Sequence, residues 1–254
     1  MTTIHGFAQL ALLREHPSPE WREADQLVAA SAERMKVLVD DLLTLAKLDR
    51  EPAYQDEPVD LREVAADVIR AVALVPGAHR ITLGALIGTD EAPPAPARGD
   101  PHRLRQAAAN LVQNALVHAG GDETIEVRVG PATSGPAFGA EAADRFSATP
   151  ALPPGLPVSV LEVVDHGAGL TREDALRVFE RFYRTDVTRA RDQHGSGIGL
   201  AIATTITAHH GGRLELDTVA GHGATFRLVL PAGPARAVDA ARGEGQAHSA
   251  DGPV

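Results

Sequence analysis

Two asparagines on one predicted helix have side chains suited to hold a metal ion between phosphates. Asn110 and Asn114 are four residues apart in a segment that Asp100 and Pro101 begin as a helix N-terminus. At about 100° per residue, both amides lie on one stripe of that helix. An amide oxygen can bind Mg²⁺ without adding the repulsive charge of a carboxylate. A solvated polar face is the alternative, and this helix alone does not decide between the two.

An aspartate and two glycines follow an apolar strand pattern. The segment DHGAG (165–169) comes directly after LEVV. Gly167 and Gly169 would let the backbone approach a flat ligand, and the Asp165 carboxylate would accept a hydrogen bond from an amino group such as that of adenine. A plain turn is the more frequent explanation of such a short motif.

Alternating glycines precede a second helix. Gly195, Gly197 and Gly199 belong to the segment GSGIGL, which ends at Leu200. Exposed backbone N–H groups and the dipole of the following helix favour a phosphate here. The spacing matches neither a GxGxxG motif after a strand nor GxxxxGK[ST], so a dinucleotide-binding fold and a phosphate-binding P-loop are both disfavoured.

The elements that position these residues alternate between helices and strands after residue 58. Apolar residues recur with the helical or the strand period between turn signals. This order indicates a two-layer α+β sandwich. The predicted helices cover 60–72, 100–119 and 172–182, with another from Gly199, and the predicted strands cover 81–83, 124–129, 158–164, 213–218 and 225–230.

The first 51 residues are predicted to form an antiparallel helical hairpin. One helix carries apolar residues at helical spacing from Ile4 to Leu12, and the second begins at Ser18-Pro19 and runs to about Arg50. Two helices bury little surface alone, so we expect the seam of the second helix to pair with a second copy in a four-helix bundle. The alternative is a hairpin packed on its own C-terminal domain. The seam has Val28, Met35 and Leu42 at one heptad position and Ala24, Ser31, Leu38 and Leu45 at the other, with Ala32, Val39 and Ala46 beside them.

Composition excludes several classes of function. The 254 residues contain no cysteine, which excludes disulfides, thiolate zinc sites and a cysteine nucleophile. The net charge of −10 does not supply the basic surface of a nucleic-acid-binding protein. No apolar run approaches the ~20 residues that span a bilayer, and the start lacks the features of a signal peptide. We therefore expect a soluble, cytoplasmic chain without membrane contact of its own.

Glycine and proline divide the remainder of the chain. They cluster in 130–157, which is predicted to be a disordered insertion, and after Pro231, where a disordered tail is predicted over 232–254. The expected organisation is therefore a hairpin over 1–51, an α+β domain over 58–231 and the tail.

In their order, these motifs resemble those of the sensor histidine kinases of two-component systems, which share the Bergerat ATP-binding fold. The boxes read NLVQNALVHA (110–119), DHGAG (165–169), FERFYR (179–184), GSGIGL (195–200) and GHGATF (221–226). Each motif has low specificity, but all of them in the family's order are a strong signal. The segment RMKVLVDDLLTLAKLDR (34–50) is similar to the end of the second helix of the family's dimerisation and phosphoacceptor domain.

The resemblance implies a role for each box in binding ATP and Mg²⁺. Asn110 and Asn114 would hold Mg²⁺ and the phosphates, and Asp165 would recognise the adenine amino group. Residues 184–194 would form a mobile lid whose root is packed by Phe179 and Phe182. The other implied ATP-binding residues are Gly167 and Gly169 beside the adenine, Arg184 and Arg189 in the lid, Gly195, Gly197, Gly199 and Leu200 at the phosphates, and Gly223 and Thr225 on the far wall.

Three departures from the family pattern bear on activity. DNA gyrase and the Hsp90 chaperones have a glutamate at the position of Asn110, and an amide cannot take the proton of a hydrolytic water. Efficient ATP hydrolysis is therefore not expected, which favours phosphoryl transfer to a protein. Val117 replaces a lysine or arginine that would contact phosphate, and His194 replaces a frequent glycine of the lid.

The phosphoacceptor histidine of the family is expected a few residues before Met1. His5 lies beyond that position and is not the expected acceptor, so no catalytic residue is expected within the chain. A start codon placed too far downstream would explain the missing segment. The resemblance thus implies a catalytic region that passes the γ-phosphoryl group of ATP to an upstream histidine and thence to the receiver domain of a response regulator, as a homodimer through the hairpin.

Three alternatives remain at this point. A serine kinase of the anti-sigma-factor type shares the ATP site, but the hairpin argues against it. A non-catalytic ATP-sensing dimerisation module is favoured by Val117 and by the absent acceptor. An ATPase is disfavoured by Asn110.

Overall fold

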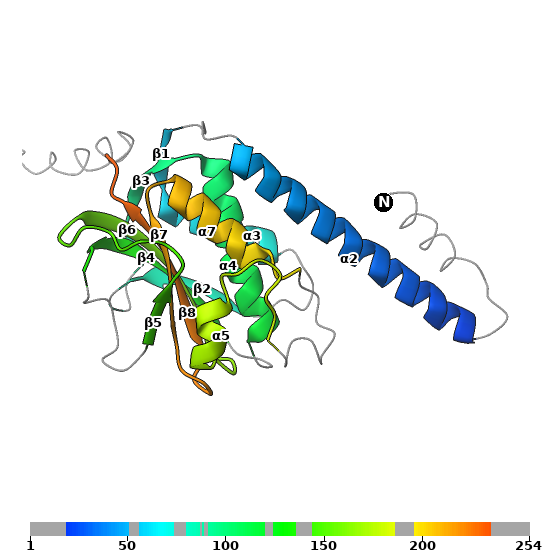
Figure 1. Cartoon of the computed structure of the whole chain (residues 1–254). Helices are drawn as coiled ribbons and strands as arrows, with labels where there is room; N and C mark the ends of the chain where they lie inside the picture. The colour runs from blue at the N-terminus through cyan, green and yellow to red at the C-terminus, as the bar shows by residue number, and fades with distance from the viewer. Residues whose placement is uncertain are drawn as a thin grey trace, which may run out of the picture.

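A mixed sheet of six strands supports the helices of the predicted site (Figure 1). The computed structural model describes residues 19–50, 56–73, 80–86, 88, 91–119, 124–135, 144–185 and 196–234. The strands of this sheet are β2 (Ile81–Ala85), β4 (Ile125–Thr133), β5 (Asp144–Ser147), β6 (Pro157–Asp165), β7 (Arg213–Thr218) and β8 (Ala224–Pro231). Their order is β2-β4-β6-β8-β7-β5, with β2 parallel to β4 and every other neighbouring pair antiparallel.

Three helices cover one face of the sheet: α3 (Leu61–Ala73), α4 (Pro101–His118) and α7 (Gly199–His209) (Figure 1). The predicted two-layer α+β sandwich is therefore confirmed. The core between the layers is formed by apolar side chains that recur at helical spacing on α4 and α7 and alternate along the strands. On α4 the buried residues are Leu104, Ala107, Ala108, Leu111, Val112 and Ala115.

Helix α4 begins where local signals predict it. The Asp100 carboxylate accepts hydrogen bonds from the backbone N–H groups of His102 (2.8 Å) and Arg103 (3.1 Å), and Pro101 occupies the first helical position. Just before this cap, β1 (Glu57–Asp60) and β3 (Pro96–Gly99) pair as a separate antiparallel ribbon that the sequence did not predict. Both strands are short and rich in proline or charge, so they carry no strand signal of their own.

The insertion predicted over 130–157 is ordered in the parts that the structure describes. Strand β4 continues to Thr133, β5 pairs with β7, and β6 begins at Pro157, so the prediction of a disordered loop is wrong for these strands. The Ser147 hydroxyl donates to the Leu214 carbonyl (2.8 Å) and fixes β5 on its neighbour. The hydrogen bonds to β7 order β5, although the surrounding sequence is rich in glycine and proline and carries no strand signal. Residues 136–143 lie outside the described residues.

The tail prediction is also corrected at its start. Ala232 bridges to Ala97 of β3, and the Gly233 N–H donates to the Pro96 carbonyl (2.9 Å). Residues from 235 onward lie outside the described residues, as does the first predicted helix near the N-terminus.

Helix α2 (Pro19–Arg50) extends away from the sheet, and its C-terminal half lies against α7 (Figure 1). Leu45 and Leu48 are buried in the core of the α+β domain, being 2% and 5% exposed. Val28, Met35 and Leu42 are 42–49% exposed. The two heptad positions of the predicted seam therefore differ: Leu38 and Leu45 of one position pack on the chain's own domain, as the alternative interpretation of the hairpin held, and Val28, Met35 and Leu42 of the other are open. None of the helices in the described part of the chain is long and apolar enough to cross a membrane.

His210 connects the C-terminus of α7 to the N-terminus of α4. Its Nδ1 donates to the Ile206 carbonyl (2.7 Å), and its Nε2 accepts the backbone N–H of Asp100 (3.0 Å). A Cβ atom added to Gly99 would lie 2.0 Å from the ring carbon Cδ2, so glycine leaves the space that the imidazole fills. Burial lowers the pKa of His210 despite the opposing charges of Asp100 and Asp56.

We expect the free energy of unfolding to fall as the pH drops below about 6.5, the ordinary pKa of an unfolded histidine. The folded imidazole has the lower pKa, so the unfolded chain takes up the proton first and acid favours unfolding. A proton on Nε2 would also displace the N–H of Asp100. Urea unfolding between pH 5 and pH 8 measures this slope. His210→Gln, which keeps an acceptor but does not titrate, should reduce the slope, and His222→Gln at the exposed hairpin tip serves as the matched histidine substitution. An unchanged slope in His210→Gln would contradict the assignment.

Candidate functional site

The floor of the site is formed by two turns that are joined through their backbones. Asp165 ends β6, is 3% exposed, and accepts the N–H of Gly167 on its Oδ1 (3.0 Å). A Cβ atom on Gly223 would lie 2.0 Å from the Asp165 carbonyl oxygen, so the β7–β8 turn packs directly on this aspartate. The Gly221 N–H donates to the Ala168 carbonyl (2.7 Å) and joins the turns a second time.

Thr218 completes the junction between these turns. Its hydroxyl donates to the Gly223 carbonyl (2.8 Å) and accepts the N–H of Leu170 (3.0 Å). Gly169 has a φ of +61°, and an added Cβ atom would lie 2.2 Å from the Val219 carbonyl oxygen. Thr225 lies half-buried on β8 opposite Val164, next to this junction. The structure thus brings the first and third predicted glycine boxes together.

The C-terminus of α4 lies against the same aspartate turn. A Cβ atom on Gly167 would lie 2.2 Å from the His118 carbonyl oxygen, so the two backbones are in contact. Partial burial and the nearby Arg184 guanidinium lower the pKa of the His118 imidazole. Arg184 is therefore near enough to the end of α4 for its charge to act on His118. No role was expected for His118, and its position inside the asparagine box was the available signal.

Asn110 joins the middle of α4 to the first residue of α7. Its Nδ2 donates to the Gly199 carbonyl (3.0 Å), and a Cβ atom on Gly199 would lie 3.6 Å from the Asn110 Cγ. This contact connects the asparagine box with the second glycine box across 89 residues. Asn114 lies one turn further along α4 and is half-buried. Both carboxamides are therefore on the stripe that the sequence predicted.

The N-terminus of α7 offers backbone donors. The N-cap residue Ile198 provides no side-chain hydrogen bond to the helix, so the first N–H groups of α7 have no side-chain cap. Gly197 has a φ of +69°, and its carbonyl accepts the N–H of Phe182 (2.8 Å). Leu200 is buried and holds the first turn in the core. Arg189 and Gly195, two of the predicted ATP-binding residues, lie outside the described residues.

The segment before the predicted lid is held by one polar cluster. Helix α5 (Arg172–Arg177) is shorter than the predicted 172–182. The Tyr183 hydroxyl donates to Asp174 (2.6 Å), which raises the pKa of the phenol and lowers the pKa of the carboxyl, and Arg177 stacks on the Tyr183 ring. Thr171 caps α5 by accepting the Asp174 N–H. This cluster turns the chain where the helical pattern would have continued.

One of the two phenylalanines of the phenylalanine box is buried in the domain. Phe179 is buried and meets the Phe226 ring edge-on, with 6.4 Å between the ring centroids. Phe182 is 53% exposed and has a φ of +66°, so the expectation that it packs the root of the lid is wrong. Its backbone rather than its ring contacts the second glycine box.

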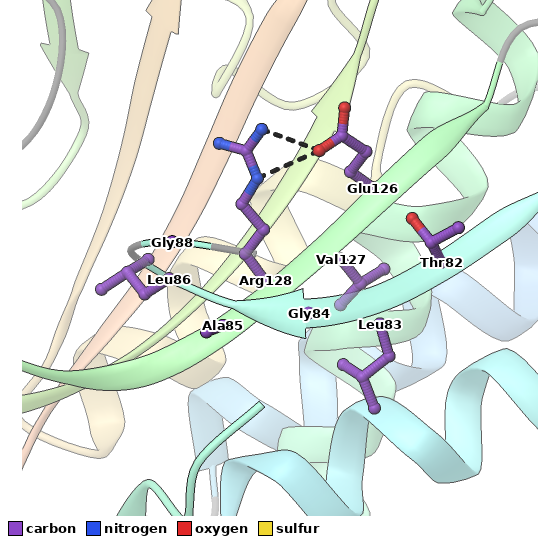
Figure 2. A pocket seen from close by; sticks show the side chains of 9 residues that line it. All are labelled: Thr82, Leu83, Gly84, Ala85, Leu86, Gly88, Glu126, Val127 and Arg128. Carbon is purple, nitrogen blue, oxygen red and sulfur yellow. Dashed lines mark hydrogen bonds and ion pairs between the residues drawn. The ribbon is translucent and has the colours of Figure 1, made fainter. Parts of the chain in front are cut away.

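A pocket of about 440 Å³ lies outside the predicted site, along β2 and β4 (Figure 2). Arg128 donates two hydrogen bonds to Glu126 Oε2 beside it, and Glu126 Oε1 lies 3.1 Å from His166 Nε2 of the aspartate turn. The Glu126–His166 contact therefore connects the pocket to the aspartate turn. Its lining consists of Thr82, Leu83, Gly84, Ala85, Leu86, Gly88, Glu126, Val127 and Arg128.

The residues brought together fit a nucleotide with a bound magnesium ion. The buried Asp165 carboxylate can accept from an amino group, and glycines at 167, 169 and 223 pack too closely for a side chain. Neutral amide oxygens on α4 suit a hard divalent cation, and the uncapped N-terminus of α7 suits a phosphate. The arrangement can bind a nucleoside triphosphate at the edge of the helical layer.

Three comparisons relate this chain to known proteins. A family model described as histidine kinase-, DNA gyrase B- and HSP90-like ATPase matches residues 99–234. The phosphate regulon sensor protein PhoR of Pseudomonas aeruginosa is 34% identical over 250 residues, which cover 95% of this chain and 48% of PhoR. The probable sensor histidine kinase TcrY of Mycobacterium tuberculosis is 29% identical, over 91% of this chain and 42% of TcrY. The chain thus spans about half the length of these relatives or less.

Solved structures show the same fold. Full-length ShkA in complex with AMPPNP has a TM-score of 0.64 at 22% identity and covers 92% of this chain and 43% of ShkA. The histidine kinase AdeS of Acinetobacter baumannii has a TM-score of 0.56 at 16% identity, over 92% of this chain and 95% of AdeS.

Proposed function

Because this chain belongs to the family of histidine kinase-, DNA gyrase B- and HSP90-like ATPases, we propose that it is the catalytic region of a sensor histidine kinase. In this proposal residues 58–231 bind ATP with Mg²⁺, and the γ-phosphoryl group passes to a histidine upstream of the hairpin and then to the receiver domain of a response regulator. The contact of Asn110 with Gly199 supports the proposal most directly, because a carboxamide lies beside the first backbone N–H groups of α7, to which Ile198 gives no side-chain cap.

Each part of the site has one task in this proposal. The Asp165 carboxylate accepts a hydrogen bond from the adenine amino group. The walls around the adenine are formed by Gly167, Gly169, Gly223 and Thr225. Bound Mg²⁺ would neutralise charge between the phosphates, and Asn110 and Asn114 would hold it. The phosphates receive hydrogen bonds from the backbone N–H groups of Gly195, Gly197, Gly199 and Leu200. The cations of the lid are Arg184 and Arg189. Positioning and charge neutralisation supply most of the catalysis in such transfers.

The asparagine at position 110 favours transfer over hydrolysis. An amide cannot accept a proton from water at neutral pH, so the site lacks the base that an ATPase places there. The Asn110 Nδ2 instead donates to the Gly199 carbonyl. This bond fixes the orientation of the amide and leaves the Asn110 Oδ1 as its acceptor atom.

The partners follow from the same proposal. The exposed residues Val28, Met35 and Leu42 of α2 support a homodimer through the helical hairpin. Sensor kinases act with response regulators, so a receiver domain is the expected second partner. Since ATP and receiver domains are cytoplasmic, we propose that this region works in the cytoplasm.

Labelled phosphoryl transfer tests the function. The chain is incubated with Mg²⁺, ATP labelled on its γ-phosphate, and a separate hairpin that extends residues 1–51 upstream to include the histidine. Acid-labile, base-stable label on the hairpin supports the proposal. Acid-stable label on a protein favours the serine kinase, and ATP binding without transfer favours the non-catalytic module. A chain that binds no ATP contradicts the site itself.

Asn114→Ala is expected to weaken the Mg²⁺-dependent part of ATP binding at least roughly tenfold, as the loss of groups around a metal commonly does. Titration of ATP with Mg²⁺ and with excess EDTA separates the two contributions. Asn114 is preferable to Asn110, whose amide also bonds Gly199. Gln113→Ala removes the neighbouring, exposed carboxamide and serves as the matched control. Equal losses in both variants would argue against Asn114 as a ligand.

A further inference from the structure

A hydrogen bond connects helix α2 to Ser196 of the second glycine box. The Ser196 hydroxyl donates to Asp41 Oδ2 over 2.6 Å, across 155 residues of sequence. The same hydroxyl oxygen accepts the N–H of Ile198, the N-cap residue of α7 (3.2 Å). Ser196 therefore holds a carboxylate of α2 and the start of α7 at the same time.

The bond lies on the face of α2 that contacts the domain. Leu45 and Leu48 follow Asp41 at helical spacing and are buried, whereas Leu42, the next residue after Asp41, is exposed. The apolar contacts of the two leucines are not directional. Asp41 adds a directional hydrogen bond, which it accepts from the Ser196 hydroxyl. Asp41 and Ser196 are both half-buried, so water screens this bond less than it would on an open surface.

The position of this carboxylate opposes the charge of the ligand. Ser196 directly precedes Gly197 and lies three residues before Gly199. In the proposed function, these two glycines supply backbone donors for phosphate. A carboxylate that binds the side chain of this segment repels an approaching polyphosphate, and it also holds a hydroxyl donor away from it. Docking of α2 and phosphate binding therefore compete.

We propose that Asp41 and Ser196 form a latch that couples the position of α2 to nucleotide affinity. The inference rests on the proposed function, because it assigns the phosphates to the second glycine box. When the latch is closed, α2 is held against α7 and the affinity for ATP is lowered. Since coupling between two equilibria is reciprocal, ATP binding loosens the contact between α2 and the domain by the same factor.

A double-mutant cycle on the whole chain tests the coupling. The dissociation constant of ATP with Mg²⁺ is measured for the unaltered chain, Asp41→Asn, Ser196→Ala and the double variant. Asp41→Asn removes the charge and weakens the bond, because a neutral amide oxygen is a weaker acceptor than a carboxylate, and it is expected to tighten binding roughly threefold to tenfold. In the Ser196→Ala background, Asp41→Asn should change nothing. Asp40→Asn removes the same charge from the neighbouring, exposed position and should leave the affinity unaltered.

Hydrogen exchange provides a second measurement that does not depend on ATP. Amides of residues 41–48 should exchange roughly threefold to tenfold faster in either single variant than in the unaltered chain. In the double variant they should exchange no faster than in a single variant. Circular dichroism confirms that each variant is folded.

Two results would overturn the latch. One is equal tightening by Asp41→Asn with and without Ser196, which would mean that the carboxylate acts through charge alone. The other is unaltered exchange of α2 in folded single variants. If the unaltered chain binds no ATP, the proposed function fails, while the exchange measurement still decides whether the latch exists.

Discussion

Asp165→Asn is expected to remove the preference of this chain for ATP over inosine triphosphate. The two nucleotides differ in the group on the purine ring: ATP carries an amino group, and inosine triphosphate carries a carbonyl oxygen. A buried carboxylate accepts a hydrogen bond from the first and repels the second. We therefore expect the unaltered chain to prefer ATP by about 10–100-fold, the range of a hydrogen bond to a charged group.

The geometry explains why an amide cannot take over this task. Asp165 Oδ1 already accepts the N–H of Gly167, which commits one oxygen to the turn. An amide at this position has a single oxygen, so its NH₂ group would face the purine, where it favours a carbonyl. The substitution keeps the shape of the side chain, and the hydrogen bond that fixes the turn can remain.

Competition between the two nucleotides for a fluorescent analogue measures the preference. Asp56→Asn, at an exposed position just before β1, controls for the loss of one negative charge. A variant at position 165 that still prefers ATP as strongly as the unaltered chain would show that another group recognises the adenine.

Gly223→Ala is expected to be the most destabilising single methyl addition in the site. The new Cβ atom would lie 2.0 Å from the Asp165 carbonyl oxygen and 2.8 Å from the Asp165 carbonyl carbon, so the two turns must separate. The residue also has a φ of +83°, which costs a side chain about 1–2 kcal/mol. Overpacking adds roughly 1–3 kcal/mol to this strain. ATP affinity should fall as well, because the displaced backbone belongs to Asp165.

The same turn contains the control for this substitution. Gly221 has a φ of +84°, but nothing lies within 4 Å of a Cβ atom added there. Gly221→Ala therefore carries the backbone strain without the overlap. The difference between the two variants in the free energy of unfolding, measured in urea, should be about 1–3 kcal/mol. Equal destabilisation would mean that the contact between the turns is softer than the structure indicates.

Local sequence signals predicted the elements whose ends are marked by capping or turn-forming residues. Helix α4 follows an aspartate and a proline, and its buried stripe follows from the helical period. Its contact with α7 spans 89 residues, and no spacing within either segment predicts it. The juxtaposition of Asn110 and Gly199 was expected only through the resemblance to a family in which the order of the boxes is known.

Elements that depend on a partner were predicted poorly. The four residues of β5, Asp144–Ser147, are too few for a strand pattern, and β5 exists because β7 supplies its hydrogen bonds. Helix α5 ends early because Tyr183 and the Phe182 backbone bind elsewhere, a competition that helical periodicity does not record.

Helix α2 shows a third kind of limit. A heptad repeat predicts an apolar stripe, but the same stripe can face a second copy or the chain's own domain. Here Leu45 packs in the domain while Met35 and Leu42 stay open. Asp41, which forms the bond to Ser196, is one of many acidic residues on a predicted helix, and the sequence provides no signal that separates it from Asp40.

Strand β5 has a consequence for the behaviour of the chain at high concentration. Without it, β7 would be the last strand of the sheet, and its backbone N–H and carbonyl groups would be open to a strand of another molecule. The short strand that replaces it at the boundary carries Arg145, which binds Asp217 through its guanidinium (3.1 Å). A charged side chain on so short an edge discourages a further strand from adding. A strand within a segment rich in glycine and proline thus protects the edge of β7 from association with a strand of another molecule.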